Sequence, residues 1–227
     1  MIIYRDIEQG TEEWLRVRAG VPTASQFDNL LAGGDGKVRK KYMLKLAGEI
    51  LTGEPQENFS TRHTRRGHEQ EPEARETYAF LHDVDVEQVG FIRNGDVGGS
   101  PDGLVGDNGG VEIKTKLPHL HLEVMLDGIA PEGSTRKYIP PHLPQIDGLI
   151  WIAEREWWDL VSYCRGLEPF ITRVYRDEKR IKKIAQAVDQ FNQELTDVLE
   201  KVRRGSAPLQ SPSHTTTTQT EDLKSVF

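Results

Sequence analysis

The chain has 227 residues, of which 36% are hydrophobic and 29% are charged, so there are enough apolar side chains for one main core. No apolar run approaches the roughly 18 residues of a membrane-spanning helix, and the first residues turn acidic too soon for a signal peptide. We therefore expect a cytoplasmic protein with no membrane partner. Cys164 is the only cysteine, which excludes disulfide frameworks and metal sites built from cysteines alone.

The overall charge argues against a protein that coats nucleic acid, because 36 acidic residues outnumber 29 Lys and Arg and the net charge is −7. Local contacts with phosphate remain open, since the basic residues are clustered. One cluster comprises Lys37, Arg39, Lys40 and Lys41, and another comprises Arg62, Arg65 and Arg66.

Four helices are predicted in the first third of the chain. The first covers residues 11–18, where Trp14 is expected in the core, and ends before the breakers Gly20 and Pro22. Thr23 is a predicted N-cap that opens a second, short helix, which ends at a run of glycines. A basic loop over residues 37–41 follows. Helical spacing of apolar residues then predicts helices over 41–51 and 67–82.

The hydrophobic period changes after residue 83. Alternating apolar residues and the turn sequences Asn94-Gly95 and Asn108-Gly109-Gly110 predict three or four short strands up to residue 115. A helix over residues 117–127, a loop over 128–141 and a buried helix over 142–153 follow. Two aromatic-rich strands are expected over 157–163 and 170–175. The whole pattern predicts an α/β fold with a mixed central sheet flanked by helices.

One long helix is predicted over residues 177–203, with a heptad stripe of apolar side chains. The stripe consists of Ile181, Ile184, Val188, Phe191, Leu195, Val198 and Val202. We interpret it as a helix that lies on the protein's own sheet, and a seam between subunits is the alternative. After Gly205 the chain is rich in Ser, Thr and Pro, which is typical of a tail that cannot order itself alone. We therefore expect one domain over residues 1–204 and a tail over 205–227.

The chemical signal is a Ser100-Pro101-Asp102-Gly103 turn followed by Glu112-Ile113-Lys114. Alternate side chains of a strand share a face, so Glu112 and Lys114 point the same way. A hairpin through residues 108–110 would bring Asp102 beside them. Two adjacent carboxylates repel each other unless a cation lies between them, and Mg²⁺ prefers such oxygen ligands together with water or phosphate oxygens. Mg²⁺ is the expected cofactor, with Mn²⁺ able to substitute.

Taken together, the acidic turn and the Glu-x-Lys strand resemble the PD-(D/E)xK nucleases and, more closely, the phage recombination exonucleases of the lambda exonuclease type. The likeness extends to about residue 203. It includes Glu8-Gln9-Gly10, Trp14, Arg18-Ala19-Gly20, Thr23-Ala24-Ser25 and Gly67-His68-Glu69-Gln70-Glu71. It implies a restriction-endonuclease-like core with Asp102, Glu112 and Glu71 as metal ligands. It also implies catalytic roles for Lys114 and Gln145, and phosphate binding by Arg18 and Ser25.

Several of these residues have simpler interpretations from the sequence alone. Glu71 and Arg75 are spaced for an ordinary ion pair on a helix surface. Ser25 could help to cap its helix, and Arg18 could interact favourably with the end of its helix dipole. A glutamine such as Gln145 needs no function in a helix. His119 and His121 do not share a helical face, so they make a poor zinc pair.

The resemblance implies a Mg²⁺-dependent 5′-to-3′ exonuclease that degrades the 5′-ended strand of duplex DNA and leaves 3′ single strands for recombination by annealing. Its implied partners are duplex DNA ends, a single-strand annealing protein and further copies of the chain in a trimeric ring. The residues expected along the DNA backbone are Lys37, Arg39, Lys41, Arg65 and Arg66. The alternatives are a structure-specific or restriction-like endonuclease of the same fold, and a non-catalytic DNA-binding module whose acidic cluster is structural.

Overall fold

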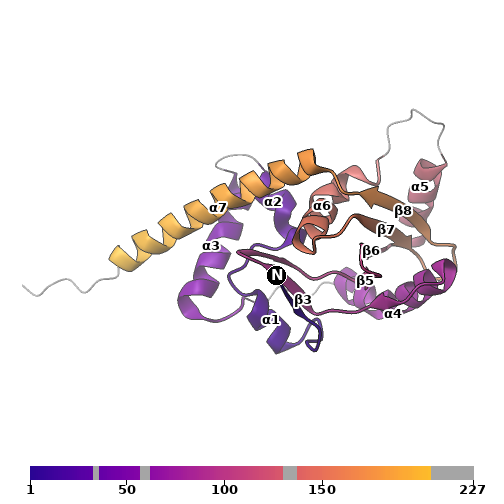
Figure 1. The fold of residues 1–227 in the computed structure, drawn as a ribbon, viewed down its shortest axis with the longest axis horizontal. Helices are drawn as coiled ribbons and strands as arrows, with labels where there is room; N and C mark the ends of the chain where they lie inside the picture. The colour runs from indigo at the N-terminus through magenta and orange to yellow at the C-terminus, as the bar shows by residue number, and fades with distance from the viewer. Residues whose placement is uncertain (33–35, 57–61, 130–136, 206–227) are drawn as a thin grey trace, which may run out of the picture.

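The computed structural model describes residues 1–32, 36–56, 62–129 and 137–205, with only the backbone of residues 62–68 (Figure 1). Its centre is a five-stranded mixed sheet in the order β2-β5-β6-β7-β8. The strands are β2 (Val86–Glu87), β5 (Gly103–Val105), β6 (Gly109–Thr115), β7 (Trp157–Tyr163) and β8 (Phe170–Tyr175). Only the β6–β7 pair is parallel. The predicted mixed sheet flanked by helices is confirmed.

A second, smaller sheet has three antiparallel strands. It consists of β3 (Phe91–Asn94) between β1 (Ile2–Tyr4) and β4 (Val97–Gly99). An isolated bridge joins Thr23 to Gly98, so this sheet holds the segment that follows the first helix. The strand β1 was not predicted from the sequence, because three residues are too few to show an alternation of apolar and polar side chains.

The helices bury two separate apolar clusters against the five-stranded sheet. The helix α4 (Arg62–His82) covers one face, where Ala74 and Tyr78 pack with Val111, Ile113 and Val161. The larger cluster, on the other side, contains apolar residues of α6 (Leu143–Ile152) together with Trp158 and Leu160 of β7. Because neighbouring residues of β6 face opposite clusters, Val111 and Ile113 are core residues while Glu112 points toward α6.

The remaining helices are α1 (Glu12–Arg18), the 3-10 turn η1 (Ala24–Gln26), α2 (Phe27–Leu31), α3 (Lys37–Thr52), α5 (Pro118–Gly128) and the 3-10 turn η2 (Pro140–His142). Thr11 caps α1 through its side chain, whereas Thr23 makes no side-chain cap to η1. The expected basic loop over residues 37–41 is wrong, because α3 begins at Lys37. Among the described residues, no helix is both long and apolar enough to cross a bilayer.

The long helix α7 (Glu178–Gly205) packs on the protein's own domain chiefly through other helices. Its main contacts are with α2, α3 and α6, and its buried side chains belong to the same apolar cluster as Trp158 and Leu160 of β7. In Figure 1 its last turns extend past the body of the domain. The buried stripe passes from Leu195 to Leu199, while Val202 is exposed. A straight helix of 3.6 residues per turn drifts away from a strict seven-residue repeat, which accounts for the shift.

The β5–β6 hairpin confirms the prediction that matters most for the site, although its turn lies elsewhere. Gly109 and Gly110 belong to β6, where a Cβ atom would come within 2.1 Å of Trp157 and 2.4 Å of Trp158. The turn itself spans residues 106–108, and Gly106 has a φ of +51°, a conformation that glycine adopts without strain. The two glycines are thus required for close packing on β7.

Candidate active site

The register of the β5–β6 hairpin places Asp102 beside Glu112. Gly103 pairs with Val111 in the antiparallel ladder, so the residue before Gly103 lies next to the residue after Val111. The Asp102 side chain is fixed there, because its Oδ2 accepts a hydrogen bond of 2.6 Å from the backbone N–H of Ile113. The hairpin therefore aims the acidic side chain of the turn toward the Glu112–Lys114 segment.

Glu112, Lys114 and Gln145 form a closed triangle of hydrogen bonds. Lys114 Nζ donates to Glu112 Oε1 at 2.7 Å and to Gln145 Oε1 at 3.0 Å. Gln145 Nε2 donates to the same Glu112 oxygen at 2.7 Å. Gln145 belongs to the first turn of α6, where Pro144 is tolerated because the first helical N–H groups need no partner. The structure thus brings the helix glutamine to the strand pair.

The acidic groups are buried close to one another, which changes their protonation. Burial raises the pKa of Asp102 well above its usual value, and the nearby carboxylates of Glu112 and Glu71 raise it further. Burial also lowers the pKa of Lys114, but the attraction of Glu112, Asp102 and Glu71 outweighs it, so the pKa of Lys114 lies above its ordinary value. The site accumulates negative charge that a cation would relieve.

An unused oxygen supports the assignment of a cation site. Glu112 is 4% exposed, and no described residue donates a hydrogen bond to its Oε2 atom. A buried carboxylate oxygen without a partner is costly, so it indicates a ligand that supplies the missing contact. Carboxylate oxygens are the ligands of hard dications such as Mg²⁺. Asp102 and Glu112 therefore fit such an ion.

The third expected ligand, Glu71, is engaged in a different contact. Its Oε1 forms an ion pair of 2.5 Å with Arg75 Nη2, the helix pairing that its spacing allows. Within the described ranges, no group of three His, Cys, Asp or Glu side chains is placed to hold one metal ion. The geometry therefore fits a site of two carboxylates completed by water and substrate oxygens, the coordination that is common for Mg²⁺.

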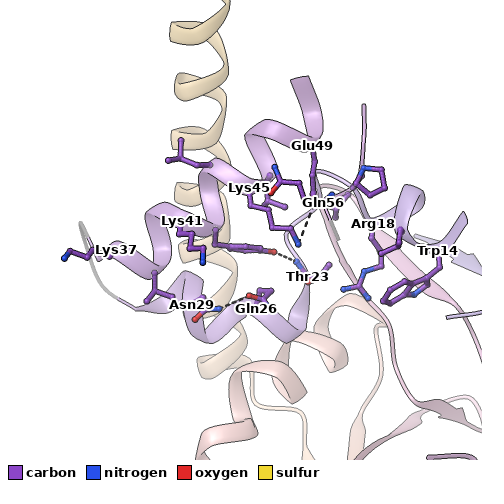
Figure 2. Close-up of a pocket in the computed structure, with 18 residues that line it drawn as sticks. Trp14, Arg18, Thr23, Gln26, Asn29, Lys37, Lys41, Lys45, Glu49 and Gln56 are labelled. Atoms are coloured by element: carbon purple, nitrogen blue, oxygen red, sulfur yellow. Dashed lines mark hydrogen bonds and ion pairs between the residues drawn. The ribbon is translucent and has the colours of Figure 1, made fainter. Parts of the chain in front are cut away.

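A pocket of about 920 Å³ is lined by residues of α1 and α3 and of the segments that follow them (Figure 2). Arg18 lines it and donates from Nη1 to Ser100 Oγ at 2.9 Å. The indole of Trp14 donates to the same oxygen at 2.9 Å, and its ring lies 3.9 Å from the Arg18 guanidinium carbon. Trp14 is thus a half-buried wall of the pocket and not the core residue that we expected. Burial lowers the pKa of Arg18 to about 10.

Lysines of α3 form the opposite wall of this pocket. Lys37, Lys41 and Lys45 are spaced four residues apart, so they share one face of the helix, and Figure 2 shows them in sequence along α3. Lys45 also ion-pairs with Glu49 at 3.6 Å. Lys45 and Glu49 are among the pocket residues that sequence reasoning missed, together with Gln26, Asn29, Tyr42 and Gln56. The four-residue spacing of Lys37, Lys41 and Lys45 could have predicted that Lys45 lines the pocket. Nothing in the sequence indicates that the Glu49 side chain points into it.

Other predicted DNA contacts have mixed positions. Arg39 turns toward α7, where it forms a bidentate ion pair with Glu194 and lies over the Phe191 ring. Because this ion pair occupies the Arg39 side chain, we no longer propose Arg39 as a DNA contact. Ser25 is exposed, and its Oγ lies 3.4 Å from Thr23 Oγ1, a pocket residue. The side chains of Arg65 and Arg66 lie outside the described residues.

The histidines behave as their spacing predicts. His121 is fully buried, and its two ring nitrogens contact Ser162 Oγ and the Glu168 carbonyl, each at 2.8 Å. Both nitrogens are therefore satisfied by the protein, so His121 is a core residue and not a metal ligand.

Comparisons with known proteins were made against families and solved structures. The family described as YqaJ-like viral recombinase domain matches residues 13–156. Two crystal structures of an alkaline exonuclease from Laribacter hongkongensis, one of them in complex with dAMP, match with a TM-score of 0.75 and 34% identity. Each match covers 86% of this chain and 97% of the other.

A phage related exonuclease from Haemophilus somnus 129PT shares the fold at a TM-score of 0.60 and 12% identity. That match covers 80% of this chain and 96% of the other. Comparison with curated protein sequences gives no match.

Proposed function

The chain belongs to the YqaJ-like viral recombinase family, and we propose that it is a Mg²⁺-dependent exonuclease that degrades the 5′-ended strand of linear duplex DNA. The observation that carries this proposal is the convergence of Asp102, Glu112, Lys114 and Gln145 at the end of one hairpin. The likeness of this chain to the structures of an alkaline exonuclease supports the reaction class. The resulting 3′ single strands suit recombination by annealing.

Asp102 and Glu112 would hold the metal ion, the latter through its unpaired Oε2. When bound, the ion lowers the pKa of a water molecule and offsets negative charge on the phosphorus centre. Mn²⁺, with the same preference for oxygen ligands, is expected to substitute. Glu71 lies close enough to raise the pKa of Asp102. It would therefore add negative charge near the ion without binding it directly.

Lys114 would hold a proton at Nζ, beside the position where the water attacks. Glu112 and Gln145 fix that atom from two sides at 2.7 and 3.0 Å, so its direction does not depend on substrate. In the metal-free protein the carboxylates favour the ammonium form. Lys114 would release this proton more readily in the metal-loaded protein, because a neighbouring positive charge disfavours the ammonium form. An arginine could not serve in this way, because it stays protonated.

The pocket beside the hairpin would bind the 5′ phosphate. Arg18 Nη1 and Ser100 Oγ already meet there, and Ser100 is two residues from Asp102, so a phosphate on Arg18 would lie next to the proposed metal site. Ser25 would add a hydroxyl from the adjacent turn. Lys37, Lys41, Arg65 and Arg66 would contact the backbone of the duplex without reading bases.

The partners of the proposed reaction follow from the same family resemblance. We propose that the chain acts as a ring-shaped homotrimer on duplex DNA ends and passes the 3′ strand to a single-strand annealing protein.

The test is digestion of end-labelled linear duplex with a 5′ phosphate, compared with closed circular duplex, in Mg²⁺ or Ca²⁺. Progressive release of label from the 5′ end in Mg²⁺ is expected, with intact circles and no cleavage in Ca²⁺. Cleavage of the circle would replace the exonuclease by an endonuclease of the same fold. Equal activity of Asp102→Asn and wild-type protein would support the non-catalytic alternative.

A further inference from the structure

The backbone of the Ser100–Asp102 segment is held by side chains from distant parts of the chain. Gln9 Nε2 donates to the Pro101 carbonyl at 2.8 Å and to the Val89 carbonyl at 3.0 Å. Arg75 Nε donates to the Asp102 carbonyl at 2.8 Å. The two contacts reach adjacent carbonyl groups, and neither involves a group proposed to bind metal or DNA.

Arg75 also contacts a second acidic residue of the site. Its Nη2 pairs with Glu71 Oε1 at 2.5 Å, and its side chain is only 11% exposed. The planar guanidinium presents its donors in a fixed fork, so one buried side chain sets the distance between α4 and the segment that carries Asp102. A lysine has a single charged centre and cannot reproduce both contacts at that spacing.

We propose that Arg75 and Gln9 are positioning residues that hold the Pro101–Asp102 backbone so that the Asp102 carboxylate faces the metal ion. This inference rests on the proposed function. A carboxylate ligand binds well only in a narrow range of directions, and side chains that hold ligands in place typically contribute about 10- to 100-fold to metal affinity. Gln9 and Arg75 act on the backbone and leave the Oδ2 contact with Ile113 to fix the side chain.

If Arg75 acts only through its charge, its removal should raise the affinity for a dication; if it positions Asp102, its removal should lower that affinity. Removing a cation beside three carboxylates would by itself strengthen binding of a dication. If Arg75 positions Asp102, the same substitution weakens binding. Arg75→Met removes both the charge and the fork, while Arg75→Lys keeps the charge and loses the fork. The sign of the change in Arg75→Met therefore separates the two roles.

The experiment measures Mn²⁺ binding to the full chain without DNA by isothermal titration calorimetry, together with the Mg²⁺ concentration that gives half-maximal cleavage. Affinity is expected to fall about 10- to 100-fold in Arg75→Met and to fall also in Arg75→Lys, with cleavage partly restored by excess Mg²⁺. Arg204→Met is the matched control, because Arg204 forms the same i,i+4 pairing with Glu200 at the end of α7. Its metal affinity should equal that of the wild type.

Folded Arg75→Met protein with unchanged or stronger Mn²⁺ binding would overturn the role of Arg75. If that variant does not fold, Gln9→Met decides, since it removes the Pro101 contact without changing charge. Its Mn²⁺ affinity is expected to fall, and an unchanged affinity would overturn the proposal. Wild-type protein that binds no Mn²⁺ would instead contradict the metal site, and with it the proposed function.

Discussion

At Asp102, burial and the carboxylates of Glu112 and Glu71 raise the pKa of the side chain. A carboxyl group whose pKa is raised on folding lowers the free energy of unfolding as pH rises from its unfolded pKa through its folded pKa. Above the unfolded pKa of the carboxyl group, Asp102 therefore lowers the free energy of unfolding of the metal-free protein. Metal binding would remove that cost.

Asp102→Asn should consequently raise the melting temperature of the metal-free protein and at the same time lower its cleavage rate. Its amide oxygen can still accept from the Ile113 N–H, while the repulsion with Glu112 and Glu71 disappears. We expect the metal-free variant to melt roughly 2 °C or more above wild type at pH 8, with cleavage reduced by more than about 100-fold. Thermal melts with and without Mg²⁺ test this, since Mg²⁺ should stabilise the wild type only. A variant that melts lower while Mg²⁺ still stabilises it would contradict the account.

Arg18 makes a prediction about the DNA end. Its guanidinium is held against Ser100 and Trp14 at one wall of the pocket, so Arg18→Met should reduce the preference for a 5′ phosphate over a 5′ hydroxyl by roughly 10-fold, as expected for loss of a charge-assisted hydrogen bond. The initial cleavage rates of the two substrates give the ratio. Arg16→Met is the control, since the exposed Arg16 pairs with Glu12 on the same helix. An unchanged ratio in Arg18→Met would remove Arg18 from the phosphate site.

At the level of elements, α3 and α7 are joined by the Arg39–Glu194 pair. Arg39 is 11% exposed and Glu194 is 37% exposed, and the pairing with Arg39 lowers the pKa of Glu194. A lowered pKa contributes stability above the unfolded pKa, and that contribution is lost as pH falls through the folded value. The packing of α7 should therefore depend on pH in the acid range.

Glu194→Gln should lower the free energy of unfolding by about 0.5–1 kcal/mol at pH 7, the value expected for a partly exposed bidentate pair. The difference from wild type should shrink below the usual pKa range of glutamate. Urea unfolding at pH 7 and at about pH 3.5 measures both, with Glu200→Gln in the exposed pair with Arg204 as the control. A difference that is equal at the two pH values would show that the ion pair is not its cause.

The elements that the sequence predicts well are those with a local signal. Strands β7 and β8 are aromatic-rich segments, and their predicted bounds agree with the structure. The approach of Asp102 to Glu112 was predictable, because a hairpin needs only a short turn between two strands. The direction of Arg39 toward Glu194, 155 residues later, was not, since no local pattern encodes which side of α3 another helix will cover.

For the whole molecule, the proposed phosphate pocket and the proposed metal site are linked through the hydrogen bond between Arg18 and Ser100. Arg18 lines the pocket and is hydrogen-bonded to Ser100, and Ser100 is two residues from Asp102 of the proposed metal site, so phosphate capture and cleavage would occur close together. This arrangement would fix the distance from the DNA end to the cleaved bond, which a nuclease acting at ends requires. The proposed direction of degradation thus rests on the spacing between Arg18 and the hairpin.

We predict that the tail over residues 205–227 is dispensable for cleavage, because its composition offers few side chains to bury. Residues 206–227 lie outside those that the structure describes. A chain that ends at Gly205 should cleave linear duplex at the same rate as the full chain. Loss of nuclease activity in the shortened, folded protein would show that the tail contributes to the reaction or to assembly.

The most direct test of the account is a crystal structure of the protein grown with Mn²⁺, with the ion located by its anomalous scattering. The account predicts an ion bound by Asp102 and by Oε2 of Glu112, with Lys114 Nζ and Gln145 alongside. An ion bound elsewhere with these two carboxylates unoccupied, at a Mn²⁺ concentration that supports cleavage, would contradict it.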